Sequence, residues 1–284
     1  MKKFTFLFTS LLLTLTFFSC SKNETNITEN KNTSVTSKNT ENIIPFPENY
    51  DINSSGASSY NNIGDHLDSK YFSHLDFYNM QSNDTLTILP KFKTYQQTTE
   101  FTCGPASALM VLHHYDENKY NELDIADIMK CHKDLNGNNT EEIGVANERG
   151  EWGTSTDRMI VFFNKIGWKV KSSLTEGKLE GGYTFDDPLK FKDFVIENLK
   201  NNTPIMVEWI DWAGHWAVII GYDTMGTEHF GDDVIILADP YDTSDHLQDG
   251  YHIYPAERFF YMWMDKGILP ENQDVQQWII ATPN

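Results

Sequence analysis

The chain has 284 residues and carries 41 Asp and Glu against 22 Lys and Arg, a formal net charge of −19 at pH 7. A chain this acidic is unsuited to binding nucleic acid, or anionic lipid through a basic face. Its three cysteines include no CxxC pair, so neither a disulfide framework nor a cysteine-rich zinc site is expected, and the fold depends on its hydrophobic core.

The N-terminus has the features of a secretory signal. Two lysines precede an apolar run, Phe4 to Phe18, that is too short to span a membrane comfortably. The run ends in Phe-Phe-Ser-Cys, which resembles a bacterial lipobox with Phe17 at the usual leucine position. We therefore predict that residues 1–19 are a signal peptide and that Cys20 is lipidated. Ordinary cleavage near Ser19 is the alternative.

A polar segment follows the signal. Residues 20–65 are dominated by Asn, Ser, Thr, Glu and Lys and contain few apolar residues, so we expect a disordered tether. Attached to lipid at Cys20, such a tether would hold a domain clear of the membrane, outside the cytoplasm. The domain itself is then residues 66–284. Without the signal the chain has 20 basic and 41 acidic residues, a net charge of −21.

The first half of the domain has mainly helical periodicity. One short strand is expected at 86–92. Capping residues and turn signals then delimit four helices, the third capped by Thr154 or Ser155 and the fourth with a proline in its first turn. These helices are predicted at residues 104–114, 121–132, 154–167 and 187–201.

The second half changes to runs of β-branched and aromatic residues between turn signals. Helices followed by strands predict an α+β protein, with N-terminal helices packed on a C-terminal antiparallel sheet. The strands are predicted at 204–210, 215–222, 233–239 and 276–282, with one more helix at 256–264.

Cys103 is placed at the start of the first helix, in the stretch "YQQTTEFTCGPASALMVLHHY". Pro105 favours the first helical turn, so Cys103 lies at or just before the helix N-terminus. Free backbone N–H groups and the positive end of the helix dipole favour a thiolate at such a position, and the thiolate is the nucleophilic form. A buried structural cysteine is the alternative reading.

Three other residues are placed to complete a nucleophilic site. Gln97 precedes Cys103 by six residues and could donate its amide to an oxyanion, together with the backbone N–H of Cys103. His215 begins one strand, after Gly214, and Asp239 ends another. Cysteine, histidine and carboxylate at the ends of elements suit a base-activated nucleophile.

These motifs, Q-x5-CGPA, then GHWAVIIGYD, then ADPYD, together resemble the papain-like cysteine peptidases. Within that group the chain is most similar to the bacteriocin-leader peptidases and their free-standing bacterial relatives. The resemblance covers roughly Leu86 to Asn284 and implies a papain-like fold that needs no cofactor. It implies Cys103 as nucleophile and His215 as general base. It further implies that Asp239 orients His215 and that Gln97 belongs to the oxyanion hole.

Some neighbouring residues offer alternative assignments. Gln96 could be the oxyanion donor, although the six-residue spacing favours Gln97. His113 and His114 lie more than two turns into the helix, where solvation or core packing is the simpler explanation of a histidine.

Metal binding is not expected. Cys131 and His132 are not accompanied by further ligands at metal spacing. The stretch beginning at Asp134 resembles a calcium loop but has Asn139 at the glycine position and Val145 at the final glutamate position, so a polar turn is preferred.

Three tryptophans, Trp209, Trp212 and Trp216, flank His215. Core packing is the ordinary explanation for tryptophans in a strand. A loop before a catalytic base must face the substrate, however, so we expect Gly214, Trp212 and Trp216 to line a substrate groove.

The carboxylate partner of His215 is predicted from strand geometry. Asp223 is eight residues further along the same strand, roughly 26 Å away at ~3.3 Å per residue. If the strands 216–222 and 234–238 pair about a turn centred on Thr227, Asp239 lies opposite His215. Asp239 is therefore the expected partner.

The expected function is a membrane-tethered, extracytoplasmic cysteine peptidase or amidase. It would cleave a peptide or amide bond through a thioester intermediate, with transfer to an amine as a related reaction. The alternative is a catalytically silent papain-like module that binds a peptide or a cell-wall component. Retention of Cys103, His215 and Asp239 together argues against that alternative.

Overall fold

The structure is a computed structural model that describes residues 40–61, 63–133, 150–176, 178–266 and 269–284. The predictions of a signal peptide in 1–19, of a lipidated Cys20 and of a polar turn after Asp134 concern residues outside this description. Within the described residues, no helix has the length and apolar character needed to cross a membrane.

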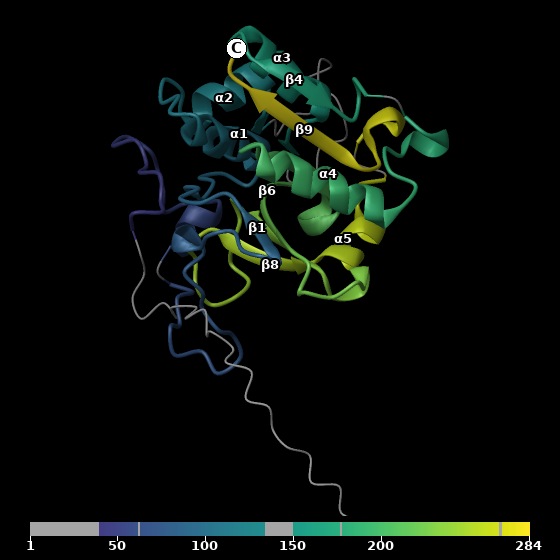
Figure 1. Cartoon of the computed structure of the whole chain (residues 1–284). Helices are drawn as coiled ribbons and strands as arrows, with labels where there is room; N and C mark the ends of the chain where they lie inside the picture. The colour runs from purple at the N-terminus through teal and green to yellow at the C-terminus, as the bar shows by residue number, and fades with distance from the viewer. Residues whose placement is uncertain (1–39, 62, 134–149, 177, 267–268) are drawn as a thin grey trace, which may run out of the picture. The chain divides into compact units, whose positions relative to one another are not determined.

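A seven-stranded antiparallel sheet is the centre of the domain (Figure 1). Its strands run in the order β4-β9-β5-β6-β7-β8, and β1 pairs with the far end of β6. A separate two-stranded sheet joins β2 (His132–Lys133) to β3 (Glu151–Trp152). The strands of the main sheet are β1 (Leu86–Ile88), β4 (Lys169–Ser172), β5 (Ile205–Trp209), β6 (His215–Asp223), β7 (Val234–Ala238), β8 (Tyr251–Pro255) and β9 (Gln277–Thr282).

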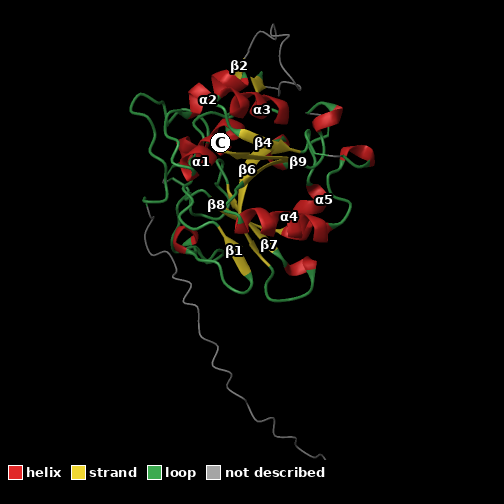
Figure 2. Ribbon diagram, turned by 45° about the horizontal axis from the view of Figure 1, so that its top comes forward, coloured by secondary structure: helices red, strands yellow, loops and turns green. Residues whose placement is uncertain are grey.

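The helices form two groups, and in Figure 2 the strands β4, β6 and β9 appear between them. In the first group, α1 packs on α2 and β6, and α3 packs on α2, β4 and β9; in the second, α4 lies on β6 and β1 and contacts α5. The α+β class predicted from the sequence is confirmed. The helices are α1 (Cys103–His114), α2 (Glu122–Met129), α3 (Thr156–Lys165), α4 (Pro188–Lys200) and α5 (Ala256–Met262).

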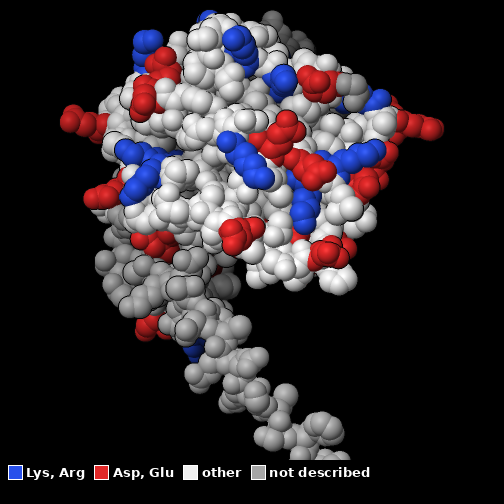
Figure 3. Space-filling view, viewed as in Figure 1, with Lys and Arg blue, Asp and Glu red and all other residues white. Residues whose placement is uncertain are grey.

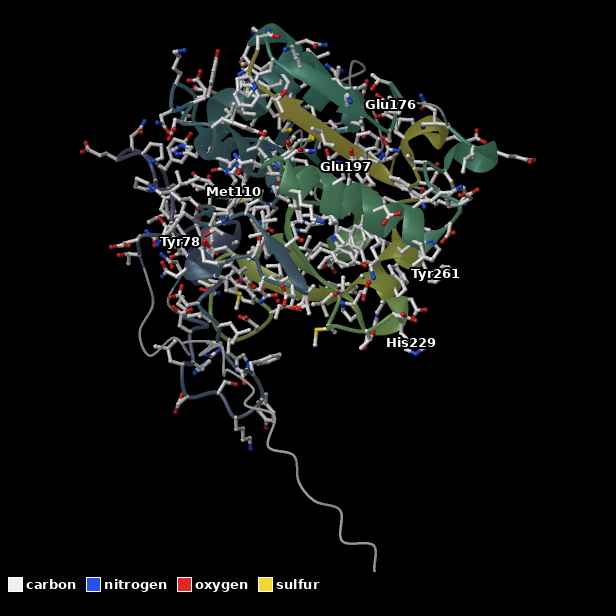
Figure 4. The ribbon with its side chains drawn as sticks, in the orientation of Figure 1. Tyr78, Met110, Glu176, Glu197, His229 and Tyr261 are labelled. Carbon is white, nitrogen blue, oxygen red and sulfur yellow. The ribbon has the colours of Figure 1, made fainter. Side chains whose placement is uncertain are left out.

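Helix α1 begins in the interior of the domain. Every residue from Cys103 to Leu112 is buried, and Met110, Val111 and Leu112 are 0 % exposed. In Figure 4, Met110 lies among the interior side chains, whereas His229, in the turn between β6 and β7, lies at the periphery. Truncating one of these core side chains would cost about 2–5 kcal/mol. The core therefore fixes the position from which α1 presents its first residue.

The predicted disordered tether, 20–65, differs from the structure over its second half. From Asn42 onward the described residues lie against the domain. Asn42 Nδ2 donates to the Asp249 carbonyl at 3.0 Å, Ile44 is 2 % exposed, and residues Ala57–Tyr60 form a short 3-10 helix. A few apolar residues in a polar stretch suffice to anchor it, and average composition does not reveal them. The packed region thus begins well before residue 66.

The hairpin of β6 and β7 forms as predicted, but its register is different. Val218 pairs with Ala238, and a bulge interrupts the ladder between Ile219 and Gly221. Extended by one step, this register places Asp239 opposite Ala217 rather than His215. The offset is two residues, so the side chains still lie on the same face of the sheet. His215 and Asp239 are therefore diagonal neighbours.

The surface in Figure 3 carries charges of both signs. Lys and Arg side chains are interspersed with Asp and Glu on the face shown, and they are not sorted by sign. This face therefore has basic as well as acidic side chains, although the chain as a whole is strongly acidic.

Candidate active site

Cys103 is the first residue of α1, at the position predicted for it. It is 7 % exposed, and it lies close enough to His215 to help raise the pKa of that imidazole. Its neighbour Gly104 allows the helix to approach the loop before α3, because a Cβ there would lie 2.1 Å from Thr154 Cγ2. The close approach fixes the helix start, and with it the sulfur.

His215, the first residue of β6, contacts Asp239 as well as Cys103. Its Nε2 lies 2.6 Å from Asp239 Oδ1, and both side chains are almost completely buried. Asp239 Oδ1 also accepts from the backbone N–H of Tyr241 at 2.8 Å. Since Nε2 faces the carboxylate, Nδ1 is the ring nitrogen that remains for the thiol.

The electrostatics favour a charged imidazole. Burial alone would lower the pKa of His215, but the Asp239 carboxylate and the interaction with Cys103 raise it to about 10. Burial would raise the pKa of Asp239, and the opposing charge of His215 and its hydrogen bonds hold that pKa below the ordinary value. The pair is therefore an imidazolium and a carboxylate at neutral pH.

Gln97 lies in the loop that leads to Cys103. Its backbone N–H donates to the carbonyl of Pro240, the residue after Asp239, at 2.9 Å. Its Nε2 donates to the Thr99 carbonyl at 2.7 Å, which uses one of the two N–H bonds of the amide. Gln97 is thus held beside the residues that follow β7.

Gln96, the alternative donor, is directed elsewhere. Its Nε2 faces the carbonyls of Asp242 and Gln248 at 3.5 Å and 3.4 Å. These contacts commit the Gln96 amide to the loop between β7 and β8.

The three predicted groove residues have different surroundings. Trp212 is 62 % exposed, and its ring lies 5.1 Å from that of Tyr241. Trp216 is 1 % exposed and donates to the Thr154 carbonyl, so it packs beneath the site. A Cβ at Gly214 would lie 2.5 Å from Asp265 Oδ2, which fills the space next to this glycine. Of the three, only Trp212 presents a large surface to a ligand.

A pair of buried acids that was not predicted from the sequence lies next to the site. Glu208 of β5 and Asp265 are 3 % and 2 % exposed, and each affects the pKa of the other. Burial, the neighbouring Asp265 and the charge of Cys103 raise the pKa of Glu208 well above its usual value. A raised pKa favours the neutral form of a carboxyl group. An acidic residue inside the apolar run "PIMVEWI" was the available signal.

The other histidine and cysteine candidates are accounted for by ordinary contacts. Burial lowers the pKa of both His113 and His114, and His114 Nε2 contacts the Asn202 carbonyl at 3.1 Å. Cys131 is buried and, with Cys103, forms no disulfide among the described residues. The described part of the chain has no cluster of three or more His, Cys, Asp or Glu suited to a metal ion.

The sequence was compared with models of protein families. The model described as the Peptidase_C39 like family matches residues 89–267, well over half of the chain. The chain belongs to the Peptidase_C39-like family. The resemblance to cysteine peptidases is thereby confirmed at the level of the family. The matched region includes every residue of the site described above.

The structure was also compared with solved structures. It is similar to the peptidase domain of Streptococcus ComA, a bi-functional ABC transporter involved in a quorum sensing pathway. The two chains are 16 % identical, with a TM-score of 0.39, and the match covers 68 % of this chain and 99 % of that one. A comparison with curated protein sequences found no match.

The N-terminal region lies outside the family match. Residues 40–88, which contain β1 and the segment around Gly56, precede the first matched residue. Contacts of that segment with the loop before Cys103 are therefore features of this chain rather than of the C39-like family model.

Proposed function

We propose that the protein is a cysteine peptidase or amidase that cleaves a peptide or amide bond with Cys103, His215, Asp239 and Gln97. The observation that carries the proposal is that one buried imidazole contacts both a helix-start thiol and a carboxylate. Because the pKa of His215 is raised, its imidazolium still holds a proton at neutral pH and can give it to a leaving group.

The proposed reaction has two steps. The Cys103 sulfur attacks the carbonyl carbon, and the oxygen takes the negative charge of a tetrahedral intermediate next to the Cys103 N–H and the Gln97 amide. His215 gives its proton to the leaving nitrogen as the C–N bond breaks, which leaves a thioester. In the second step His215 takes a proton from water, whose oxygen attacks the thioester and releases the acid and the thiolate.

Asp239 keeps the imidazole oriented and stabilises its charged form throughout. Trp212 and the adjacent Tyr241 offer apolar surface to the substrate near this pair. An amine in place of water in the second step would transfer the acyl group instead of hydrolysing it.

Hydrolysis is tested with the mature chain, residues 20–284, and a library of quenched fluorescent peptides. Turnover should be lost by about 10⁴-fold or more in Cys103→Ala and His215→Ala, because the nucleophile and its base act as a unit. A thioester adduct mapped to Cys103 by mass spectrometry should accumulate in an acid quench. Peptide binding without cleavage, equal in the wild type and Cys103→Ala, would instead establish the silent binding module.

We further propose that the domain acts outside the cytoplasm, attached to a membrane through Cys20. The motif that supports this is the charged and apolar N-terminus that ends in Phe-Phe-Ser-Cys. The substitution Cys20→Ser should move the protein from the membrane fraction to the soluble fraction of its host. A wild-type protein already in the soluble fraction would contradict the anchor and leave the enzymatic proposal untouched.

A further inference from the structure

Glu122 is a buried acid that the proposed reaction does not use. It is the first residue of α2, and its side chain is 0 % exposed. Its carboxyl group accepts four hydrogen bonds, and all of them come from the loop 95–102, which ends next to Cys103. The donors are Tyr95 Oη to Oε2 at 2.9 Å, Thr98 N to Oε1 at 2.8 Å, Thr98 Oγ1 to Oε2 at 2.7 Å and Thr102 Oγ1 to Oε1 at 2.5 Å.

Four donors on one side chain fit the carboxylate form, which only accepts hydrogen bonds. Burial raises the pKa of Glu122, and these hydrogen bonds oppose that effect. Removing the carboxylate would leave several buried donors without this acceptor, which is unfavourable for a buried polar group. On the side that faces α2, the conformation of the loop therefore depends on this side chain.

The residues that Glu122 holds adjoin the proposed oxyanion donors. Thr98 follows Gln97, and Thr102 precedes Cys103. Thr102 is also the N-cap residue of α1, yet its hydroxyl does not cap the helix and is directed to Glu122 instead. A single carboxylate thus fixes both the backbone that carries the Gln97 amide and the backbone N–H of Cys103.

The opposite side of the loop is held by the N-terminal segment. The Ser58 N–H donates to the Gln97 carbonyl at 3.1 Å, and Ser55 Oγ donates to the Thr98 carbonyl at 3.2 Å. Gly56, with φ of +68°, lies so close that a Cβ would be 2.5 Å from the Gln97 oxygen. The loop is clamped between α2 and this segment, so a displacement on the Glu122 side is transmitted to Gln97.

We propose that Glu122 is a positioning residue for the oxyanion hole: it holds the loop 95–102 so that the Gln97 amide and the Cys103 N–H meet the developing negative charge. This role rests on the proposed function. It is distinct from activation of the thiol, which depends on His215 and Asp239. Loss of Glu122 should therefore slow reactions that pass through an oxyanion and spare those that do not.

Two small reagents separate these effects in the mature chain. Iodoacetamide alkylates a thiolate by direct displacement of iodide, with no oxyanion. With p-nitrophenyl acetate the sulfur attacks the ester carbonyl, an oxyanion forms, and p-nitrophenolate leaves as the acetyl group is transferred to sulfur. In Glu122→Gln we expect the rate of Cys103 acylation to fall about tenfold, while the rate of alkylation changes less than about twofold. A tenfold loss is smaller than the loss of about 10²–10³-fold caused by deleting an oxyanion donor outright.

A double-mutant cycle tests the route of the effect. Because Glu122 acts partly through Gln97 and partly through the Cys103 N–H, the double variant Glu122→Gln with Gln97→Ala should lose less acylation rate than the product of the two single losses. Strictly multiplicative losses would contradict the route through Gln97. Thr102→Val removes only one of the four donors and should have a smaller effect of the same kind, which keeps the test available if Glu122→Gln folds poorly.

The matched control is Asp233→Asn. Asp233 is also 0 % exposed and accepts from Tyr222 Oη at 2.6 Å and from Lys192 Nζ at 2.8 Å, but it lies at the far end of β7 from Asp239. We expect a lower melting temperature and an unchanged ratio of acylation to alkylation.

Two results would overturn the inference, and they are distinguishable. A Glu122→Gln variant with a lower melting temperature but an unchanged ratio has lost only a structural residue. A wild type that releases no more p-nitrophenolate than Cys103→Ala lacks the proposed thiol chemistry, and the positioning role is then rejected with it.

Discussion

Two buried carboxyl groups lie near the nucleophile, and their surroundings give them opposite pKa shifts. Asp239 faces His215 Nε2 and a backbone N–H, which hold its pKa below the ordinary value despite burial. Glu208 faces another carboxyl group, that of Asp265, and burial together with that neighbour and Cys103 raises its pKa well above the ordinary value.

Both acids are buried, so it is their partners that give their pKa shifts opposite directions. Donors and a cation keep Asp239 ionised, where its charge stabilises the imidazolium. Burial and an acidic neighbour raise the pKa of Glu208, which disfavours a further negative charge next to the Cys103 sulfur. The two sites are 2–5 % exposed, so exposure does not distinguish them.

Among these carboxyl groups, Asp239 should give the largest effect when it is substituted. We expect Asp239→Asn to lower turnover by up to about 10⁴-fold, less than loss of Cys103 or His215, because an amide still orients the ring. The pKa of His215 is raised to about 10, chiefly by this carboxylate acting against burial, so the imidazolium persists below that pH and is lost as the pH rises through it.

The measurement for Asp239→Asn is the pH profile of kcat/KM. In the wild type the alkaline limb should lie near pH 10, and in the variant it should move to lower pH because the raising charge is gone. An alkaline limb that stays in place would show that Asp239 does not control the protonation of His215.

The substitution Glu208→Gln tests the other acid, because it removes the titrating carboxyl group and keeps the shape of the side chain. A folded pKa above the unfolded value means that the stability contribution of Glu208 is complete below its ordinary pKa and is lost as the pH rises. The wild type should therefore lose melting temperature from pH 5 to pH 9, and Glu208→Gln should lose less. A protein of this size responds by about 2–4 °C per kcal/mol.

Thermal unfolding at several pH values checks this expectation, and turnover at pH 7 should remain within about threefold. Parallel curves for the two proteins would contradict a protonated Glu208. Asp239→Asn is the opposite control. The pKa of Asp239 is lowered in the folded protein, so its contribution to stability is present above its ordinary pKa and disappears in acid. The asparagine variant lacks that contribution.

The smallest effect is expected from Asp223→Asn. Asp223 ends β6 next to Val234, and its Oδ1 accepts from the Met225 N–H in the turn at the far end of the hairpin from His215. Turnover should stay within about twofold. Should this variant lose activity while remaining folded, the assignment of Asp239 as the partner of His215 would be mistaken.

Much of the fold follows from local patterns in the sequence. All the predicted helices and strands have counterparts, because long periodic segments with capping residues carry strong local signals. Strands β2, β3, β4 and β8 were not predicted, and β2 and β3 have only two residues each. β4 is a four-residue strand rich in lysine, and β8 has a mixed pattern of burial and ends at a proline, so neither presents a continuous apolar run.

The site was predictable where each residue stands at the end of an element. Cys103, His215 and Asp239 lie near one another, even though the β-bulge and a two-residue offset change the register of the hairpin, and their catalytic roles stay predictions. Glu122 and Asp265 could not be found in this way, because their partners are 20 or more residues distant in sequence and only tertiary structure brings them together.

The proposed function requires Cys103 to be an activated nucleophile, and its reactivity can be compared with that of Cys131 in the same protein. The two cysteines are 7 % and 6 % exposed, so accessibility does not favour either. Alkylation by iodoacetamide at pH 7, followed by peptide mapping, should modify Cys103 at least about tenfold faster than Cys131, since a free thiol is only a few per cent thiolate at that pH. His215→Ala should abolish the difference. Equally slow reaction of both cysteines in the wild type would contradict the account.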